Sequence, residues 1–261
     1  MINLIFDTHI AKIKKDLENS RFPKTAKALY RFYEKISSIK ELLDKITDNK
    51  EIYVAKVLLR VLFEHLIVAY YIFYRFNLEG NDKVGEDYYQ DYFSSEFFKQ
   101  KGYIQKIDNI KNSKTQNIHG LDYIKVSNKE LEEVTEKQYH EIMEIGNKFK
   151  IESILKQLNK KEDKTINSNK LHEYMIGFLD EYNKLSSYVH GGPMAEKQTF
   201  DDKIDFNEDI YKIKSWGETS LNAMKENILI FLIDNEHEYI QLLGPVMEER
   251  IKLLASNILN E

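Results

Sequence analysis

The chain has 261 residues, a net charge of −5 and no cysteine. Disulfides and thiolate–zinc sites are therefore excluded, and the acidic balance argues against a protein that coats nucleic acid by charge alone. Only three prolines and ten glycines are present to interrupt helices. The sequence predicts an all-α multi-helix bundle of about eight to ten helices, forming a single domain over 1–261 with its core bundle at about 23–235.

The first part of the chain is expected to form three long helices. Residues 3–19 have an amphipathic pattern, and a second helix over about 23–46 starts with a proline, which suits a first helical turn. After a turn at 47–50, the helix over 51–76 is apolar on nearly every side. A helix of this kind belongs in the middle of a bundle, so 51–76 is predicted to be the most buried helix, with Gly80 as its C-cap.

The second part of the chain alternates helical patterns with polar stretches. Ser127 and Glu130 have the spacing of a capping box, which predicts that a helix begins there and runs to about Gly146. The remaining expected segments are helices at 86–101, 149–159, 171–189, 206–233 and 238–257, a solvated loop at 160–170, and a loop at 194–206.

The N-terminal stretch lacks the basic-then-apolar order of a signal peptide. Arg60, Glu64, His65 and Arg75 interrupt the apolar run of the third helix, which excludes a membrane span there. A cytoplasmic protein without a membrane association is therefore expected.

A polar stripe on the helix over 51–76 is the first candidate site. Tyr53, Arg60, Glu64, Tyr71 and Arg75 fall on one side of this otherwise apolar helix. Arg60 and Glu64 are four residues apart, which lets their side chains meet. The pair is interpreted either as part of a catalytic site, with Tyr71 and Arg75 as substrate-binding residues, or as a structural ion pair that fixes helix register.

The end of the helix over 171–189 is the second candidate site. His190 lies there beside Gly191 and Gly192, whose backbone could approach a ligand closely. Ser186 and Tyr188 just before it are candidate substrate-binding residues. The alternative is a helix C-cap at which the dipole favours a histidine. His190 is expected within about 8 Å of Arg60 or Glu64 if the two helices are core neighbours.

Arg60 and His65 together resemble the Arg-x4-His signature of the HEPN superfamily, all-helical domains that include metal-independent ribonucleases of defence and toxin systems. The resemblance implies that the arginine and histidine act on the scissile phosphate, usually across a dimer. On a helical wheel, however, His65 lies about 140° from Arg60, on the apolar side.

Arg60, Glu64 and the stretch from Ser186 to Gly191 also resemble an uncharacterised bacterial all-helical family, over roughly residues 25–235. That resemblance implies the fold and a shared polar cluster. Motifs of zincins, P-loop proteins, dinucleotide-binding folds, di-iron bundles and α/β-hydrolases are absent from the sequence.

We therefore expect a HEPN-like metal-independent endoribonuclease, an effector of a bacterial defence or toxin-type system, with no cofactor and no metal. Arg60 would bind the phosphate, Glu64 would orient Arg60, and His190 or His65 would be the general acid or base. The expected partners are RNA, a protein of the defence system and a second copy of the chain in a homodimer. The alternative is a non-catalytic helical module that binds a partner protein or a nucleotide-like ligand.

Overall fold

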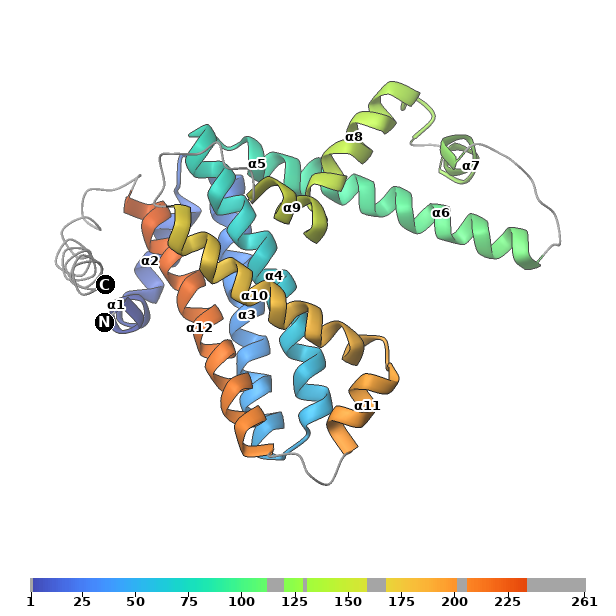
Figure 1. Cartoon of the computed structure of the whole chain (residues 1–261). Helices are drawn as coiled ribbons and strands as arrows, with labels where there is room; N and C mark the ends of the chain where they lie inside the picture. The colour runs from blue at the N-terminus through green and yellow to red at the C-terminus, as the bar shows by residue number, and fades with distance from the viewer. Residues whose placement is uncertain (1, 112–119, 129–130, 159–167, 201–205, 234–261) are drawn as a thin grey trace.

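A computed structural model describes residues 2–111, 120–128, 131–158, 168–200 and 206–233. These residues form helices and contain no strand, which confirms the predicted all-α multi-helix bundle (Figure 1). The assignment of 1–261 to a single domain stays a prediction. The helices are α1 (Ile2–Thr8), α2 (Ile10–Glu18), α3 (Pro23–Asp48), α4 (Ile52–Glu79), α5 (Lys83–Glu86), the π-helix η1 (Asp87–Tyr92), α6 (Phe93–Lys111), α7 (Gly120–Ser127), α8 (Glu136–Lys148), α9 (Ile151–Leu158), α10 (Ser168–Val189), α11 (Pro193–Phe200) and α12 (Phe206–Ile233).

Helix α4 lies in the centre of the bundle, between α3, α10 and α12. Its buried side chains include Leu62, Phe63, Ile67 and Ile72, which point in several directions around the helix. A helix that is apolar on nearly all sides gains most when neighbours cover every side, which explains its position. The helix ends at Gly80, whose φ of 62° is the left-handed conformation of a C-cap, as the sequence predicts.

Helix α10 runs antiparallel to α4. The ring of Phe178 lies 4.9 Å from that of Phe63, and the ring of Tyr188 lies 5.7 Å from that of Tyr53. Residue numbers therefore rise along α10 as they fall along α4. This register decides which polar groups of the two helices meet.

The N-terminus of α3 is capped by a residue from a distant part of the chain. The Asp82 carboxylate accepts hydrogen bonds from the backbone N–H groups of Lys24 (2.9 Å) and Thr25 (2.7 Å). The N-cap residue Phe22 offers no side-chain acceptor. A carboxylate at this position satisfies two free donors and also interacts favourably with the helix dipole. The loop between α4 and α5 is thereby fixed against the start of α3.

An arm of α6, α7 and α8 extends from one end of the bundle (Figure 1). It is connected to the bundle through α5 and η1, and α6 packs against η1, α7 and α8. Helix α8 begins with a capping box in which Thr135 and Gln138 exchange hydrogen bonds. The predicted capping box at Ser127 is wrong, because Ser127 is the last residue of α7.

Two further boundaries differ from the prediction. The helix expected over 3–19 is divided at His9 into α1 and α2, since Thr8 and His9 have low helix propensity and the bend allows Phe6 to be fully buried. The loop expected over 194–206 begins with a helix, α11, because Pro193 serves as its first residue. The helix predicted over 238–257 and most of the loop over 160–170 lie outside the described residues.

Candidate functional site

Arg60 and Glu64 form a compact group with Tyr182 of α10. The Arg60 Nη1 donates to Glu64 Oε1 at 2.7 Å, and the Tyr182 hydroxyl donates to the same oxygen at 3.2 Å. The guanidinium carbon lies 3.1 Å from the centre of the Tyr182 ring, so the cation is stacked on the aromatic face. The predicted pair therefore exists, and its partner on α10 is a tyrosine that the sequence analysis did not assign to the site.

The two charges of this pair differ in their exposure. The Arg60 side chain is 12% exposed, whereas that of Glu64 is 43% exposed. Burial lowers the pKa of Arg60, and the neighbouring Glu64 carboxylate opposes this shift. The Arg60 Nε is buried and has no hydrogen-bond partner within the described part of the chain. The guanidinium thus depends on one carboxylate and one ring.

The residues around His190 take part in a separate group at the end of α10. Lys56 Nζ donates to the Tyr188 hydroxyl at 3.0 Å and to Asp209 at 2.7 Å, and the Tyr53 hydroxyl donates to the Tyr188 carbonyl at 2.7 Å. Tyr188 is buried. These contacts join α4, α10 and α12 and give Tyr188 a structural role.

His190 is exposed at the end of α10, where its backbone N–H donates to the carbonyl of the half-buried Ser186 at 3.3 Å. The next residue, Gly191, has a φ of 61° and ends the helix in the left-handed conformation. Eight residues separate His190 from Tyr182, or about 12 Å along the helix axis. The structure therefore brings Tyr182, rather than His190, to Arg60 and Glu64.

His65 lies on a different side of α4 from Arg60. Its half-buried ring packs against Phe32 of α3, with ring centres 5.8 Å apart. Burial lowers the pKa of His65, and the positive charge of nearby Lys35 lowers it further. The imidazole is therefore neutral at pH 7. When the pH falls below the ordinary pKa of histidine, the unfolded chain binds this proton more readily than the folded protein does, so the fold loses stability. Arg60 and His65 do not converge within one chain.

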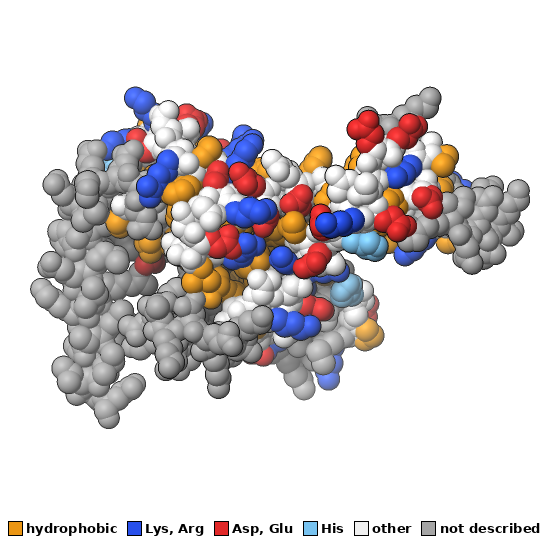
Figure 2. All heavy atoms as spheres, turned by 90° about the horizontal axis from the view of Figure 1, so that it is seen from above, with side chains coloured by type: hydrophobic (Ala, Val, Ile, Leu, Met, Phe, Trp, Pro, Cys, Tyr) orange, Lys and Arg blue, Asp and Glu red, His pale blue; other side chains and the backbone are white. Residues whose placement is uncertain are grey.

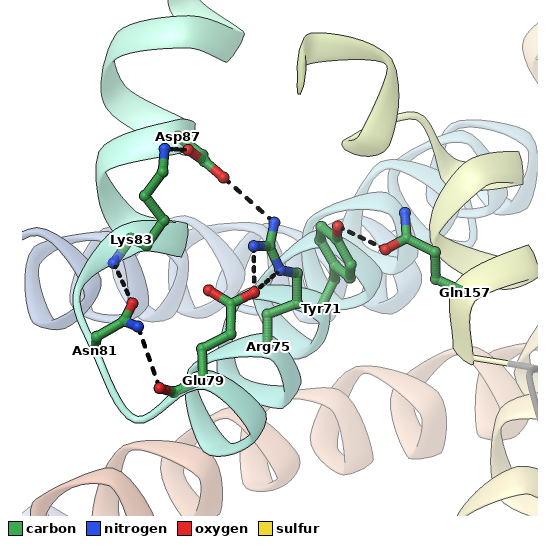
Figure 3. Close-up of polar contacts among 7 residues, drawn as sticks. All are labelled: Tyr71, Arg75, Glu79, Asn81, Lys83, Asp87 and Gln157. Atoms are coloured by element: carbon green, nitrogen blue, oxygen red, sulfur yellow. Dashed lines mark hydrogen bonds and ion pairs between the residues drawn. The ribbon is translucent and has the colours of Figure 1, made fainter. Parts of the chain in front are cut away.

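Tyr71 and Arg75 belong to a network between α4, α9 and η1 (Figure 3). The Tyr71 hydroxyl donates to Gln157 Oε1 at 3.0 Å. Arg75 donates from Nε to Glu79 at 2.6 Å and from Nη1 to Asp87 at 3.3 Å, and Lys83 also pairs with Asp87. Asp87 is nearly inaccessible to solvent. This network joins η1, from which the arm extends, to α4. The N–H groups of Arg75 that take part in it are engaged by Glu79 and Asp87.

A row of basic side chains on α3 is a feature that the sequence analysis missed. We call Lys24, Lys27, Arg31 and Lys35 the basic ridge; all four are exposed. Their spacing of three or four residues places them on one side of the helix, which is a signal that the sequence contains. Arg31 pairs with Glu34. The three lysines form no ion pair with an acid among the described residues.

Aromatic side chains border the basic ridge. Lys27 Nζ lies 4.9 Å from the centre of the Tyr89 ring, and Lys35 Nζ lies 4.9 Å from that of Phe32. The Tyr89 hydroxyl is buried with no hydrogen-bond partner among the described groups. Phe32 is buried beneath the ridge, and its ring also contacts that of His65, so it connects Lys35 to the half-buried imidazole.

Residues 25–209 match a family model described as a family of unknown function (DUF5677). The chain belongs to this family. The chain has no match among curated proteins or among solved structures. The part shared with the DUF5677 family runs from α3 to the beginning of α12, so it contains Arg60, Glu64, His65 and His190.

Other features of this family member offer less to a ligand. A depression between α3 and α12 is lined largely by charges that pair with one another, such as Lys40 with Glu218 and Lys214 with Asp48. The described residues contain no group of three or more His, Asp and Glu that could hold a metal ion. None of the described helices combines the length and apolar character that crossing a membrane requires. Acidic and basic side chains are interspersed over the face seen in Figure 2.

Proposed function

We propose that the protein binds single-stranded RNA along the basic ridge and cleaves it without a metal ion, as a HEPN-like endoribonuclease. The observation that carries the proposal is the position of the ridge beside His65. Exposed cations one helical turn apart can each contact a phosphate, and the half-buried Tyr89 ring beside Lys27 offers apolar surface to a base. The net charge of −5 is compatible with this proposal because the positive charge is local.

The proposed cleavage uses His65 as a general base. Its lowered pKa keeps the imidazole neutral at pH 7, ready to accept a proton. The ring would take the proton of a ribose 2′-hydroxyl; the 2′-oxygen would attack the adjacent phosphorus, and the 5′-oxygen would leave and take a proton from water. In this proposal Lys35 and Arg31 take the phosphate-binding role that the resemblance assigns to Arg60, since Arg60 is stacked on Tyr182.

RNA binding is tested by a pair of charge-reversed variants. Lys27→Glu/Lys35→Glu is expected to weaken binding of a single-stranded RNA at least about tenfold. The slope of the logarithm of the binding constant against the logarithm of the salt concentration should become shallower by roughly 0.7 for each phosphate that the ridge no longer neutralises. The control, Lys15→Glu/Lys197→Glu, makes the same change in net charge at exposed lysines of α2 and α11. Fluorescence anisotropy over a range of salt concentrations measures both quantities. Equal weakening in the two variants would rule out the ridge as the binding site.

Cleavage is tested in EDTA with histidine variants. His65→Ala is expected to lower the cleavage rate by a factor of about 100 or more, the usual contribution of a general base, while His190→Ala retains the rate. Gel analysis of labelled RNA gives the rate, and thermal unfolding confirms that both variants fold. A wild-type protein that cleaves no RNA, or a His65→Ala variant that cleaves normally, contradicts the proposal. As an effector of a bacterial defence or toxin-type system, the nuclease should also arrest growth when overproduced.

A second candidate function is a non-catalytic helical module that binds a partner protein or a nucleotide-like ligand. The observation that favours it is the placement of the charged groups: Arg60 is engaged by Glu64 and Tyr182, and His65 and His190 lie on other sides of the fold. Retention of RNA on the ridge without cleavage in EDTA would support this module over the nuclease.

A further inference from the structure

One face of α6 exposes large apolar side chains along the arm. Phe93, Tyr103 and Ile110 are 67%, 65% and 79% exposed, and Ile104 and Ile107 are also exposed. At 100° per residue these five side chains fall within about 120° of the helix circumference. The opposite face packs on α8, where the Phe98 ring contacts Tyr139 at 5.1 Å. The helix is therefore covered on one side and apolar on the other.

We propose that this face pairs with the same face of a second copy of the chain, with the two α6 helices antiparallel. The twofold axis passes between Tyr103 and Ile104, so that Tyr103 of one copy lies opposite Ile104 of the other. An isologous contact of this kind closes on itself and needs only one patch on each copy.

The charges at the ends of the face complement each other in this arrangement. Glu96 and Lys111 are exposed and lie on the same face as Tyr103 and Ile107. In the antiparallel pair, Glu96 of each copy is opposite Lys111 of the other, which gives two ion pairs flanking an apolar centre. A parallel pair would instead place Glu96 beside Glu96 and Lys111 beside Lys111. Charge complementarity therefore selects the antiparallel orientation.

The exposed apolar area suits a small dimer interface. Between Glu96 and Lys111, Tyr103 and the three isoleucines present several hundred Å² on each copy, which places the contact at the lower end of the size range of protein–protein interfaces. The arm also holds α6 clear of α4 and α12, which leaves room for a second bundle (Figure 1).

Single cysteines test the register, since the chain contains none of its own. Under oxidising conditions Ile104→Cys is expected to form a covalent dimer, because its two copies meet at the axis. Phe93→Cys is the control: it lies on the same exposed face, but its two copies are about 30 Å apart along the pair. Equal cross-linking of both variants, or none of Ile104→Cys, overturns the proposed pairing.

Charge changes test the interface in solution by sedimentation. Wild type is expected to be dimeric at micromolar concentration, and Ile107→Glu is expected to raise the dissociation constant at least about tenfold by placing a charge in the apolar centre. Lys111→Glu weakens the dimer, and Glu96→Lys/Lys111→Glu restores it. A monomeric wild type refutes the inference, since the apolar face of α6 is then covered by another protein or by nothing. A dimer whose dissociation constant does not change in Ile107→Glu refutes it as well. RNA binding by the ridge is unaffected by these outcomes.

Discussion

Gly85→Ala is expected to lower the free energy of unfolding by about 3 kcal/mol, a large effect for the addition of one methyl group. A Cβ at this position would lie 2.3 Å from the backbone nitrogen of Thr25 and 2.5 Å from the backbone carbon of Lys24. Backbone atoms at the capped start of α3 cannot move aside as a flexible side chain would. The added methyl group therefore separates α5 from α3.

Gly102→Ala is the matched control for this experiment. Gly102 also lies within a helix, but a Cβ added there meets no atom within 4 Å. Alanine should stabilise the helix by up to about 1 kcal/mol, since it has the higher helix propensity. Chemical denaturation measures both variants. A loss of stability in Gly102→Ala similar to that in Gly85→Ala would mean that the close approach to α3 is not the cause.

The second large effect is expected from Glu64→Ala, which should destabilise the fold by about 3 kcal/mol. This change leaves Arg60, only 12% exposed, without the carboxylate that its charge requires. Arg60→Ala should cost less, about 2 kcal/mol, because the carboxylate left behind is 43% exposed and can be hydrated. The 3–5 kcal/mol typical of a fully buried pair therefore does not apply to Arg60→Ala.

The double variant Arg60→Met/Glu64→Leu provides the comparison. It removes both charges and retains apolar volume against Tyr182, so it should cost less than Glu64→Ala alone. Thermal and chemical denaturation of the three variants give the order of stabilities. If Arg60→Ala proved more costly than Glu64→Ala, the stacking on Tyr182 would outweigh the ion pair.

The fold was predictable because it depends on local patterns. Hydrophobic periodicity identified the long helices, and Gly80 marked the end of α4 through its intrinsic freedom at positive φ. The misplaced boundaries, at His9 and Ser127, occur where several weak helix signals compete. At His9, the tertiary packing that buries Phe6 decided the outcome.

The candidate site was predictable only within one helix. The spacing of Arg60 and Glu64 was sufficient to predict their contact, because neighbours on a helix are fixed by its geometry. The axial position of α10 depends instead on how Phe178 packs against Phe63 and Trp216, and this packing brings Tyr182 to the pair. The basic ridge could have been found from its spacing, but its proximity to His65 required the packing of α3 on α4.

The cap on α3 also has a consequence for the order of synthesis. Asp82 follows Thr25 by 57 residues, so a chain leaving the ribosome exposes the start of α3 long before its cap exists. Until residues 80–85 have emerged and α4 has folded back, the amides of Lys24 and Thr25 lack the Asp82 carboxylate that accepts their hydrogen bonds. The nascent helix therefore frays at the end that carries Lys24 and Lys27. When Asp82 caps the start of α3, the helix pair α3–α4 is complete.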